Sequence, residues 1–209
     1  MNVLVSGGID SAALLVFYQQ QKFSVRALFV DFGQPAAKQE LRAVRSVCRH
    51  YRVRVSTATV RTRATFSLGE IPGRNAFLIF TATLMNGKEP GVIAIGIHEG
   101  LPYYDCGEGF VAAVQAIVDG YSAGSVKIAA PFLKWSKPTI WAFCKKHKVP
   151  IHLMLAPVLK GASLIGLMGA SRAPNWRLDT RRRGTAIRKN GSPSVFIFHK
   201  QRESRLFSA

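Results

Sequence analysis

The chain has 209 residues, of which 48% are hydrophobic, and 29 Lys and Arg against 11 Asp and Glu give it a formal charge of +18. The apolar content suffices for the core of one compact domain and excludes global disorder, while the charge calls for an anionic partner or marks a disturbed segment. Three cysteines, Cys48, Cys106 and Cys144, stand far apart, which excludes a disulfide framework and a four-thiolate zinc site and favours a reducing, cytoplasmic setting.

The first elements begin directly after Met1, without the basic and long apolar segments of a secretion signal, so we expect no signal and no membrane span. Hydrophobic spacing and Gly or Pro punctuation then predict a strand at 3–5, a helix at 12–18, a strand at 25–30, a helix at 36–51, a strand at 53–58 and a helix at 75–85. Helix 36–51 is amphipathic, with an outer face of Lys38, Arg42, Arg45 and Arg49.

The second half continues the alternation. It predicts a strand at 92–97, a helix at 109–119, a strand at 126–129 and a helix that Ser136 caps and that runs to about Lys148. Alternating strands and helices predict an α/β fold with a doubly wound, Rossmann-like parallel sheet. Beyond about Leu155 the pattern deteriorates, and only the run 195–198 resembles a strand. We therefore divide the chain into a catalytic domain at 1–153 and a basic segment at 154–209, which we expect to be loosely folded or disordered.

The segment Ser6-Gly7-Gly8-Ile9-Asp10-Ser11 follows the first strand and opens the first helix. Ligands of parallel sheets bind at this position, beyond the carboxyl end of a strand. Two glycines allow the backbone to curve around an anion, and the free N–H groups of the helix, with the hydroxyls of Ser6 and Ser11, are suited to a pyrophosphate. The alternative is an ordinary glycine turn. The Gly-Lys-Ser/Thr ending of a Walker motif is absent.

Residues 6–11 match in full the SGGxDS signature of the PP-loop ATP pyrophosphatase superfamily, which the chain resembles. Further segments resemble, in the same order along the chain, the 7-cyano-7-deazaguanine synthase (QueC) family. These are VDFGQ at 30–34, PGRN at 72–75, YYDC at 103–106, APF at 130–132 and WSK at 135–137. The resemblance covers about residues 2–154 and implies the adenine nucleotide alpha hydrolase-like version of the α/β fold.

The resemblance also implies an activity. In that family ATP is cleaved between its α and β phosphates, 7-carboxy-7-deazaguanine is adenylated, ammonia displaces AMP to give an amide, and a second activation yields the nitrile preQ0 for queuosine biosynthesis. Joining a carboxylate to ATP brings two anions together, so the site must neutralise charge, which implies Mg²⁺. A homodimer is usual in the family.

The resemblance assigns the nucleotide side of the site to the first loop and its neighbours. Ser6, Gly7, Gly8, Asp10 and Ser11 are expected to hold the pyrophosphate, with Mg²⁺ near Asp10, although Asp10 has the alternative of capping the first helix. The second strand brings Asp31 and Gln34 to the nucleotide, or these two shape a turn. Lys137, at a helix start, is expected to meet a phosphate, and its alternative is a solvated lysine.

The substrate side of the site is expected at three later segments. Arg74 and Asn75 present donors to a phosphate or carboxylate at a helix start, and the alternative for Arg74 is a surface position. Asp105 is expected to read the guanine-like edge of the acid, or else to cap a loop. His98 and Glu99 line the pocket or handle ammonia. The expected catalytic residues are Asp10, Arg74 and Lys137.

The cysteines do not support thiolation chemistry. Cys106 is either a nucleophile, as in sulfur-transferring relatives, or a pocket residue, and we interpret it as the latter because no second cysteine lies near it in the sequence. Cys48 and Cys144 are expected to pack in helices.

The C-terminal part departs from the family, whose members usually end with four cysteines that bind a structural zinc. No cysteine follows Cys144 here, so the ligands of that zinc are absent. Residues 151–209 carry 11 Lys and Arg against 2 acids. Either this segment has diverged for another purpose, or a changed reading frame or gene end has replaced the ancestral sequence. Because a structural zinc supplies much of the folding energy of a small module, we expect its loss to leave the pocket incomplete or less stable and to lower the activity.

Three functions compete. The first is the nitrile-forming ligase, and the second is a related adenylating enzyme with a changed acceptor, such as a protein terminus or another amine. The third is a catalytically silent protein that binds nucleic acid through the basic segment, which carries Arg172, Arg177, Arg181, Arg182, Arg183, Arg188 and Lys189. The alternative for these residues is a solvated polycation.

Overall fold

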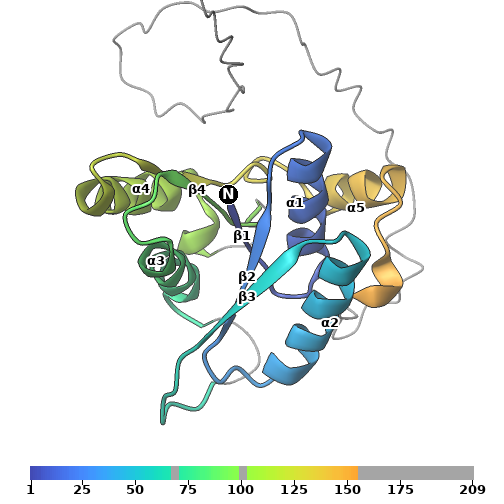
Figure 1. Ribbon diagram of the computed structural model, residues 1–209, viewed down its shortest axis with the longest axis horizontal. Coiled ribbons are helices and arrows are strands. Elements are labelled where there is room, and N and C mark those ends of the chain that lie inside the picture. Colours follow the sequence, from blue (N-terminus) through green and yellow to red (C-terminus); the bar gives the residue numbers. More distant parts are fainter. Residues whose placement is uncertain (67–70, 99–102, 155–209) are drawn as a thin grey trace, which may run out of the picture. The chain divides into compact units, whose positions relative to one another are not determined.

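A computed structural model describes residues 1–66, 71–98 and 103–154 (Figure 1). These residues belong to one compact unit. Its elements are β1 (Asn2–Leu4), α1 (Ile9–Gln20), β2 (Arg26–Asp31), α2 (Ala37–His50), β3 (Arg54–Thr59), α3 (Arg74–Asn86), β4 (Gly91–Ala94), the 3₁₀ turn η1 (Tyr104–Cys106), α4 (Glu108–Ser122), β5 (Val126–Ala129), α5 (Lys137–Lys146) and the 3₁₀ turn η2 (Ile151–Leu153).

The strands form one parallel sheet in the order β3-β2-β1-β4-β5, which confirms the predicted doubly wound fold. The chain builds outward from β1 to β2 and β3 on one side, then crosses to β4 and β5 on the other. β1 therefore lies at the point where the strand order reverses. In open parallel sheets a crevice for ligands forms there, beyond the carboxyl ends of the strands.

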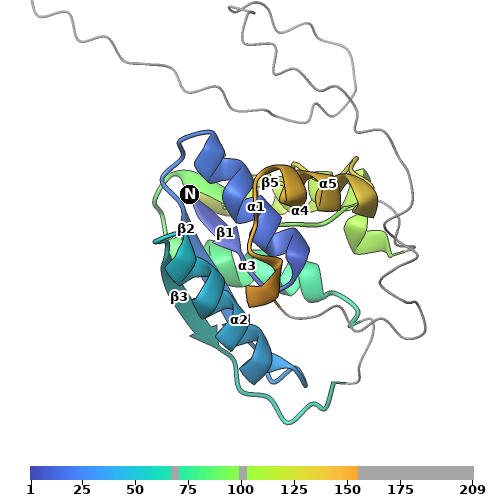
Figure 2. The ribbon, with the colours of Figure 1, turned by 90° about the vertical axis from the view of Figure 1, so that its right-hand side faces the viewer.

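Helices cover both faces of the sheet and separate the core into two clusters. Side chains alternate along each strand, so Val3, Ala27 and Phe29 join the cluster under α1, α2 and α5. Leu4, Leu28 and Val30 join the cluster under α3 and α4. Figure 2 shows α1, α2 and α5 together on one face. This burial of both faces explains why the central strands β1, β2 and β4 consist mainly of apolar residues in the sequence.

Most predicted boundaries agree with the structure within a few residues, and the two main differences lie at the site. α1 begins at Ile9, not near Ala12, because Gly8 takes the N-cap position. β4 ends at Ala94 and not at Ile97, since the chain leaves the ladder at Gly96 and runs against the first turn of α1. The predicted cap is confirmed, because the Ser136 hydroxyl accepts a hydrogen bond from the Thr139 N–H at 3.3 Å.

Two sequence predictions lie outside the described residues. These are the strand at 195–198 and the character of the basic segment beyond Met154, so the boundary at 153/154 stays a prediction. Among the described helices, none combines the length and the apolar character needed to cross a membrane.

Candidate nucleotide site at the carboxyl edge of the sheet

The Ser6–Ser11 loop connects β1 to α1, and its shape depends on Gly7. Gly7 is buried with a φ of +77°, a conformation that L side chains rarely adopt. A Cβ there would stand 2.8 Å from the Glu40 carbonyl oxygen and 3.0 Å from the Ala43 Cβ. α2 therefore packs directly on the loop backbone, and only glycine fits between them. Gly8 is the N-cap residue of α1 and has no side chain that could cap the helix. The first N–H groups of α1 therefore receive no hydrogen bond from an N-cap side chain.

The hydroxyl of Ser11 stabilises this loop through two hydrogen bonds. It donates to the Gly8 carbonyl at 2.9 Å and accepts from the Ser6 N–H at 3.2 Å, and Ser11 is 7% exposed. The sequence predicted a pyrophosphate contact for this hydroxyl. Because its only proton is donated within the loop, Ser11 shapes the loop in this structure, and the exposed Ser6 side chain is the hydroxyl left on the open side.

A cavity of about 320 Å³ opens beside this loop. It brings together seven of the side chains that the sequence predicted for the site, namely Ser6, Asp10, Ser11, Gln34, Arg74, Asn75 and His98. Five other predicted residues, Gly7, Gly8, Asp31, Asp105 and Lys137, do not line it. Glu99 lies outside the described residues. The cavity thus joins the loop after β1, the loop after β2, the start of α3 and the end of β4.

Asp10 and Lys137 form the closest charged contact of the site. The Lys137 Nζ lies 2.6 Å from both carboxylate oxygens of Asp10, across 127 residues of sequence. The His98 Nε2 stands 4.0 Å from one of those oxygens, and His98 is 8% exposed. Asp10 therefore does not cap α1, which was its alternative role. Lys137 is the first residue of α5 and is not a freely solvated lysine, because the carboxylate offsets its unfavourable place at a helix N-terminus.

Two hydrogen bonds between Asn75 and Asp105 connect α3 to η1. The Asp105 carboxylate accepts from the Asn75 backbone N–H at 3.3 Å, and the Asn75 amide donates to the Asp105 carbonyl at 3.1 Å. Asn75 is 3% exposed, whereas Arg74 is exposed at the cavity. Since the α3 N-cap is Gly73, which has no side chain, Asp105 supplies the missing cap from another segment. In this structure Asp105 therefore caps helix α3, whereas the alternative that the sequence left open was the capping of a loop, and its contact with the acid stays a prediction.

We expect Asp105→Ala to lower the free energy of unfolding by about 1–2 kcal/mol, because it leaves a helix N–H without its acceptor. Asp105→Asn keeps an acceptor oxygen and should cost less, and thermal unfolding of both variants measures the difference. If Asp105 instead reads the acid substrate, Asp105→Asn will raise the KM for the acid while its stability stays that of the unsubstituted chain.

Asp31 and Gln34 shape the turn after β2. The Asp31 carboxylate accepts from the Gly33 N–H at 3.1 Å. The Gln34 Oε1 accepts from the Phe32 N–H at 2.9 Å, and its Nε2 donates to the Val30 carbonyl at 3.2 Å and to the Glu40 carboxylate at 2.7 Å. A glutamine amide has two protons, and both are used here. Gln34 borders the cavity but has no proton left to donate to a nucleotide in this arrangement.

Two residues that sequence reasoning missed have a clear part in the site. The Glu40 carbonyl lies against Gly7, and its carboxylate holds Gln34, so α2 fixes both loops. A Cβ at Gly96 would stand 3.2 Å from the Asp10 carbonyl oxygen, which makes Gly96 the contact between the end of β4 and the start of α1. A glycine inside an apolar run is a signal of close backbone approach, and Gly96 in the run 92–97 carried it.

The cysteines behave as the sequence predicted for packing residues. Cys48 and Cys144 are buried, and burial raises the pKa of the Cys48 thiol to about 11 and, with a smaller effect of the Asp10 charge, that of Cys144 to about 12. Cys106 is buried and lines the cavity. Within residues 1–66, 71–98 and 103–154 no three His, Cys, Asp or Glu side chains gather as metal ligands. The described residues therefore do not fit a structural zinc.

Comparisons with known proteins agree with the motifs. A family model described as "Queuosine biosynthesis protein QueC" matches residues 1–70 and 63–157. The two matched segments overlap at 63–70, and the match ends at residue 157.

Curated relatives that match the chain are named 7-cyano-7-deazaguanine synthase. The chain is similar to a 7-cyano-7-deazaguanine synthase of Aquifex aeolicus, 30% identical over 71% of this chain and 82% of the relative. A Rhizobium etli protein of that name is 28% identical over 71% and 74%. A solved tRNA thiolase from Methanococcus maripaludis aligns with a TM-score of 0.47 and 16% identity over 75% of this chain and 59% of its own, too distant to bear on function. The family match spans the whole described domain, and on that ground the chain belongs to the QueC family.

Proposed function

We propose that this protein is an ATP-dependent carbon–nitrogen ligase of queuosine biosynthesis that converts 7-carboxy-7-deazaguanine and ammonia into 7-cyano-7-deazaguanine through an adenylated intermediate. One observation carries the proposal: the QueC match extends across a domain in which the complete SGGxDS loop borders a cavity of about 320 Å³. Curated relatives that match the chain over 74–82% of their length bear the name of this activity.

The reaction needs two activations. A carboxylate oxygen of the acid attacks the α-phosphorus of ATP, and pyrophosphate leaves. Ammonia then attacks the acyl carbon, AMP leaves and a proton is released, which gives the amide. The amide oxygen attacks the α-phosphorus of a second ATP and pyrophosphate leaves, and loss of AMP and the two amide protons from the resulting adduct forms the nitrile. Each activation joins an anion or a weak nucleophile to a polyanion, so the site must bind and align phosphates.

The chain's own groups suit that task. We assign the departing pyrophosphate to the N–H groups at the start of α1 and to the Ser6 hydroxyl, since a helix N-terminus favours an anion. Arg74, exposed at the other wall of the cavity, offers a planar fork of donors to the carboxylate or the α-phosphate. Lys137 lies next to the loop through Asp10 and reaches a phosphate by exchanging partners.

Magnesium fits this donor set. Mg²⁺ binds through one or two carboxylates together with substrate phosphates, and Asp10 is a cavity-lining carboxylate beside the loop. The ion would neutralise phosphate charge there. Lys137 occupies both Asp10 oxygens in the structure, so release of Lys137 toward a phosphate would free the carboxylate for the ion.

The proposal is tested by incubating the purified chain with ATP, Mg²⁺, ammonia and the deazaguanine acid, followed by mass spectrometry. We expect the nitrile and two AMP per nitrile, with no AMP when the acid is omitted. Acid-dependent AMP with no nitrile would favour a changed acceptor, a protein terminus or another amine, and AMP formation that ignores the acid would overturn both. Adding Zn²⁺ to the assay tests whether the lack of the structural zinc that is usual in the family limits the activity.

Three further features remain our proposals. A homodimer is the assembly usual in the family, and size-exclusion chromatography with light scattering measures it. Nucleic-acid binding through residues 154–209 rests on the 11 Lys and Arg of 151–209. A cytoplasmic location accords with three cysteines that form no disulfide and with a small-molecule substrate, and fractionation of cells tests it.

A further inference from the structure

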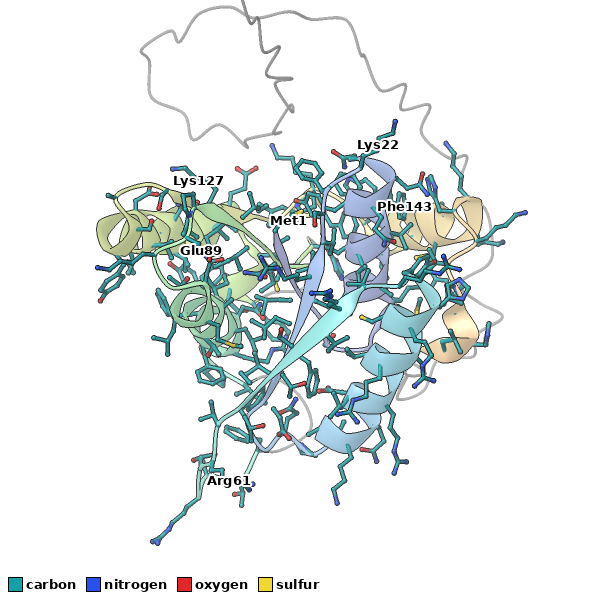
Figure 3. All side chains as sticks on the ribbon, viewed as in Figure 1. Met1, Lys22, Arg61, Glu89, Lys127 and Phe143 are labelled. Carbon is teal, nitrogen blue, oxygen red and sulfur yellow. The ribbon has the colours of Figure 1, made fainter. Side chains whose placement is uncertain are left out.

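A long run of positive charge in the described domain extends from α2 past the end of β3. Residues 37–63 contain eight Lys and Arg and a single acid, Glu40. Four of the eight, Lys38, Arg42, Arg45 and Arg49, are exposed residues of α2, and we call them the α2 basic face. In Figure 3, side chains tipped with nitrogen stand out from the outer side of this helix.

The α2 basic face is a narrow stripe. At about 100° per residue the four positions fall within an arc of about 60°, and the span from the first to the last is about 16 Å. The opposite side of α2 carries Val44 and Val47, which are buried on the sheet. Glu40 also lies on that inner side, where it holds Gln34, so the acid of this helix does not offset the outer charges.

This arrangement is unfavourable for the isolated domain. Like charges three or four residues apart on a helix destabilise it by about 0.2–0.5 kcal/mol a pair. Lys38 stands in the first turn of α2, where the helix dipole disfavours a cation. None of the four side chains takes part in an ion pair within the part of the chain that the structure describes. A polyanion that spans the stripe would remove all of these penalties together.

We infer that the α2 basic face is a binding surface for the phosphodiester backbone of double-stranded nucleic acid, independent of base sequence. Three of its four residues are arginines, whose planar fork matches phosphate oxygens in pairs. Its length of about 16 Å corresponds to about five base pairs at 3.4 Å each. No exposed large apolar side chain of the described residues comes from α2, so the face lacks the groups that insert into a lipid surface. The surface is distinct from the substrate cavity, which no residue of the face lines.

The test compares two full-length variants that each lose three positive charges. One carries Arg42→Gln, Arg45→Gln and Arg49→Gln, and the control carries Lys22→Gln, Arg26→Gln and Lys88→Gln, three exposed residues outside α2. Figure 3 labels Lys22 well away from α2. Residues 154–209 are identical in both, so their contribution cancels. Far-UV circular dichroism and thermal unfolding verify that both fold.

Binding is measured by fluorescence anisotropy with 16-base-pair DNA and RNA duplexes between 50 and 300 mM salt, and with vesicles of anionic phospholipid. We expect the Arg42/Arg45/Arg49 variant to bind either duplex at least tenfold more weakly at 100 mM salt and to lose about 2 to 3 units of the slope of log K against log salt. The control variant should stay within twofold of the unsubstituted chain. Equal weakening of both variants, no duplex binding by the unsubstituted chain, or binding to vesicles alone would overturn the inference.

Discussion

Gly7→Ala is expected to lower kcat/KM for ATP by at least about 100-fold. The alanine must adopt a φ of +77°, and its Cβ must displace the Glu40 carbonyl from 2.8 Å. The left-handed conformation alone costs about 1–2 kcal/mol. The greater effect arises because the loop and α2 move apart, and displacements of about 1 Å in a phosphate-aligning loop cost about 100-fold in rate.

Gly33→Ala is the matched control for this experiment. Gly33 also has a positive φ, +86°, but nothing lies within 4 Å of the added Cβ, so this variant carries the backbone strain without the crowding. Steady-state kinetics of AMP formation and thermal unfolding are measured for both. We expect Gly33→Ala to stay within about threefold of the unsubstituted chain, and a Gly7→Ala variant that is equally active would show that the loop does not depend on its contact with α2.

Lys137→Ala is expected to reduce kcat by about 100 to 1,000-fold, which is the effect of removing one group that stabilises transition-state charge. The stability cost should be small. The side chains of Lys137 and Asp10 are 38% and 26% exposed, and solvent screening at such positions leaves an ion pair with at most about 1 kcal/mol. A large kinetic loss with nearly unchanged thermal unfolding therefore separates a role in catalysis from a role in folding.

Lys127 and Asp119 form a comparable ion pair away from the site. Its Nζ lies 3.2 Å from Asp119, and the two side chains are 35% and 38% exposed. Lys127→Ala should leave kcat unchanged. Asp10→Asn should weaken the dependence of the rate on Mg²⁺ concentration. In a double-mutant cycle with Lys137→Ala, the combined loss of kcat should be smaller than the sum of the two single losses in free energy, because both residues act on the same phosphates. If Lys137→Ala keeps kcat within about fivefold, its contact with Asp10 is structural only.

The fold was largely predictable from the sequence because its signals are local. Apolar runs such as 92–97 and the amphipathic pattern of α2 depend on residues close together in the sequence, and each predicted element of residues 1–153 has a counterpart in the structure. The Ser6–Ser11 loop could also be predicted from the sequence, because its glycines and serines are six consecutive residues between a predicted strand and a predicted helix. Parallel strands then bring the later motifs to the same edge of the sheet.

The roles of individual side chains were decided by contacts between distant segments. Asp10 meets Lys137 across 127 residues, and Asp105 caps a helix that begins 31 residues before it. Ser11 and Gln34 carry the right chemical groups for a nucleotide, yet Ser11 donates its proton within its loop and Gln34 donates its amide protons to the Val30 carbonyl and to Glu40 of α2. Spacing along a chain reveals which residue types reach an edge of the sheet. Which proton meets which oxygen depends on packing between elements, and in this protein that packing is set by the close contact of α2 with Gly7 and of Gly96 with α1.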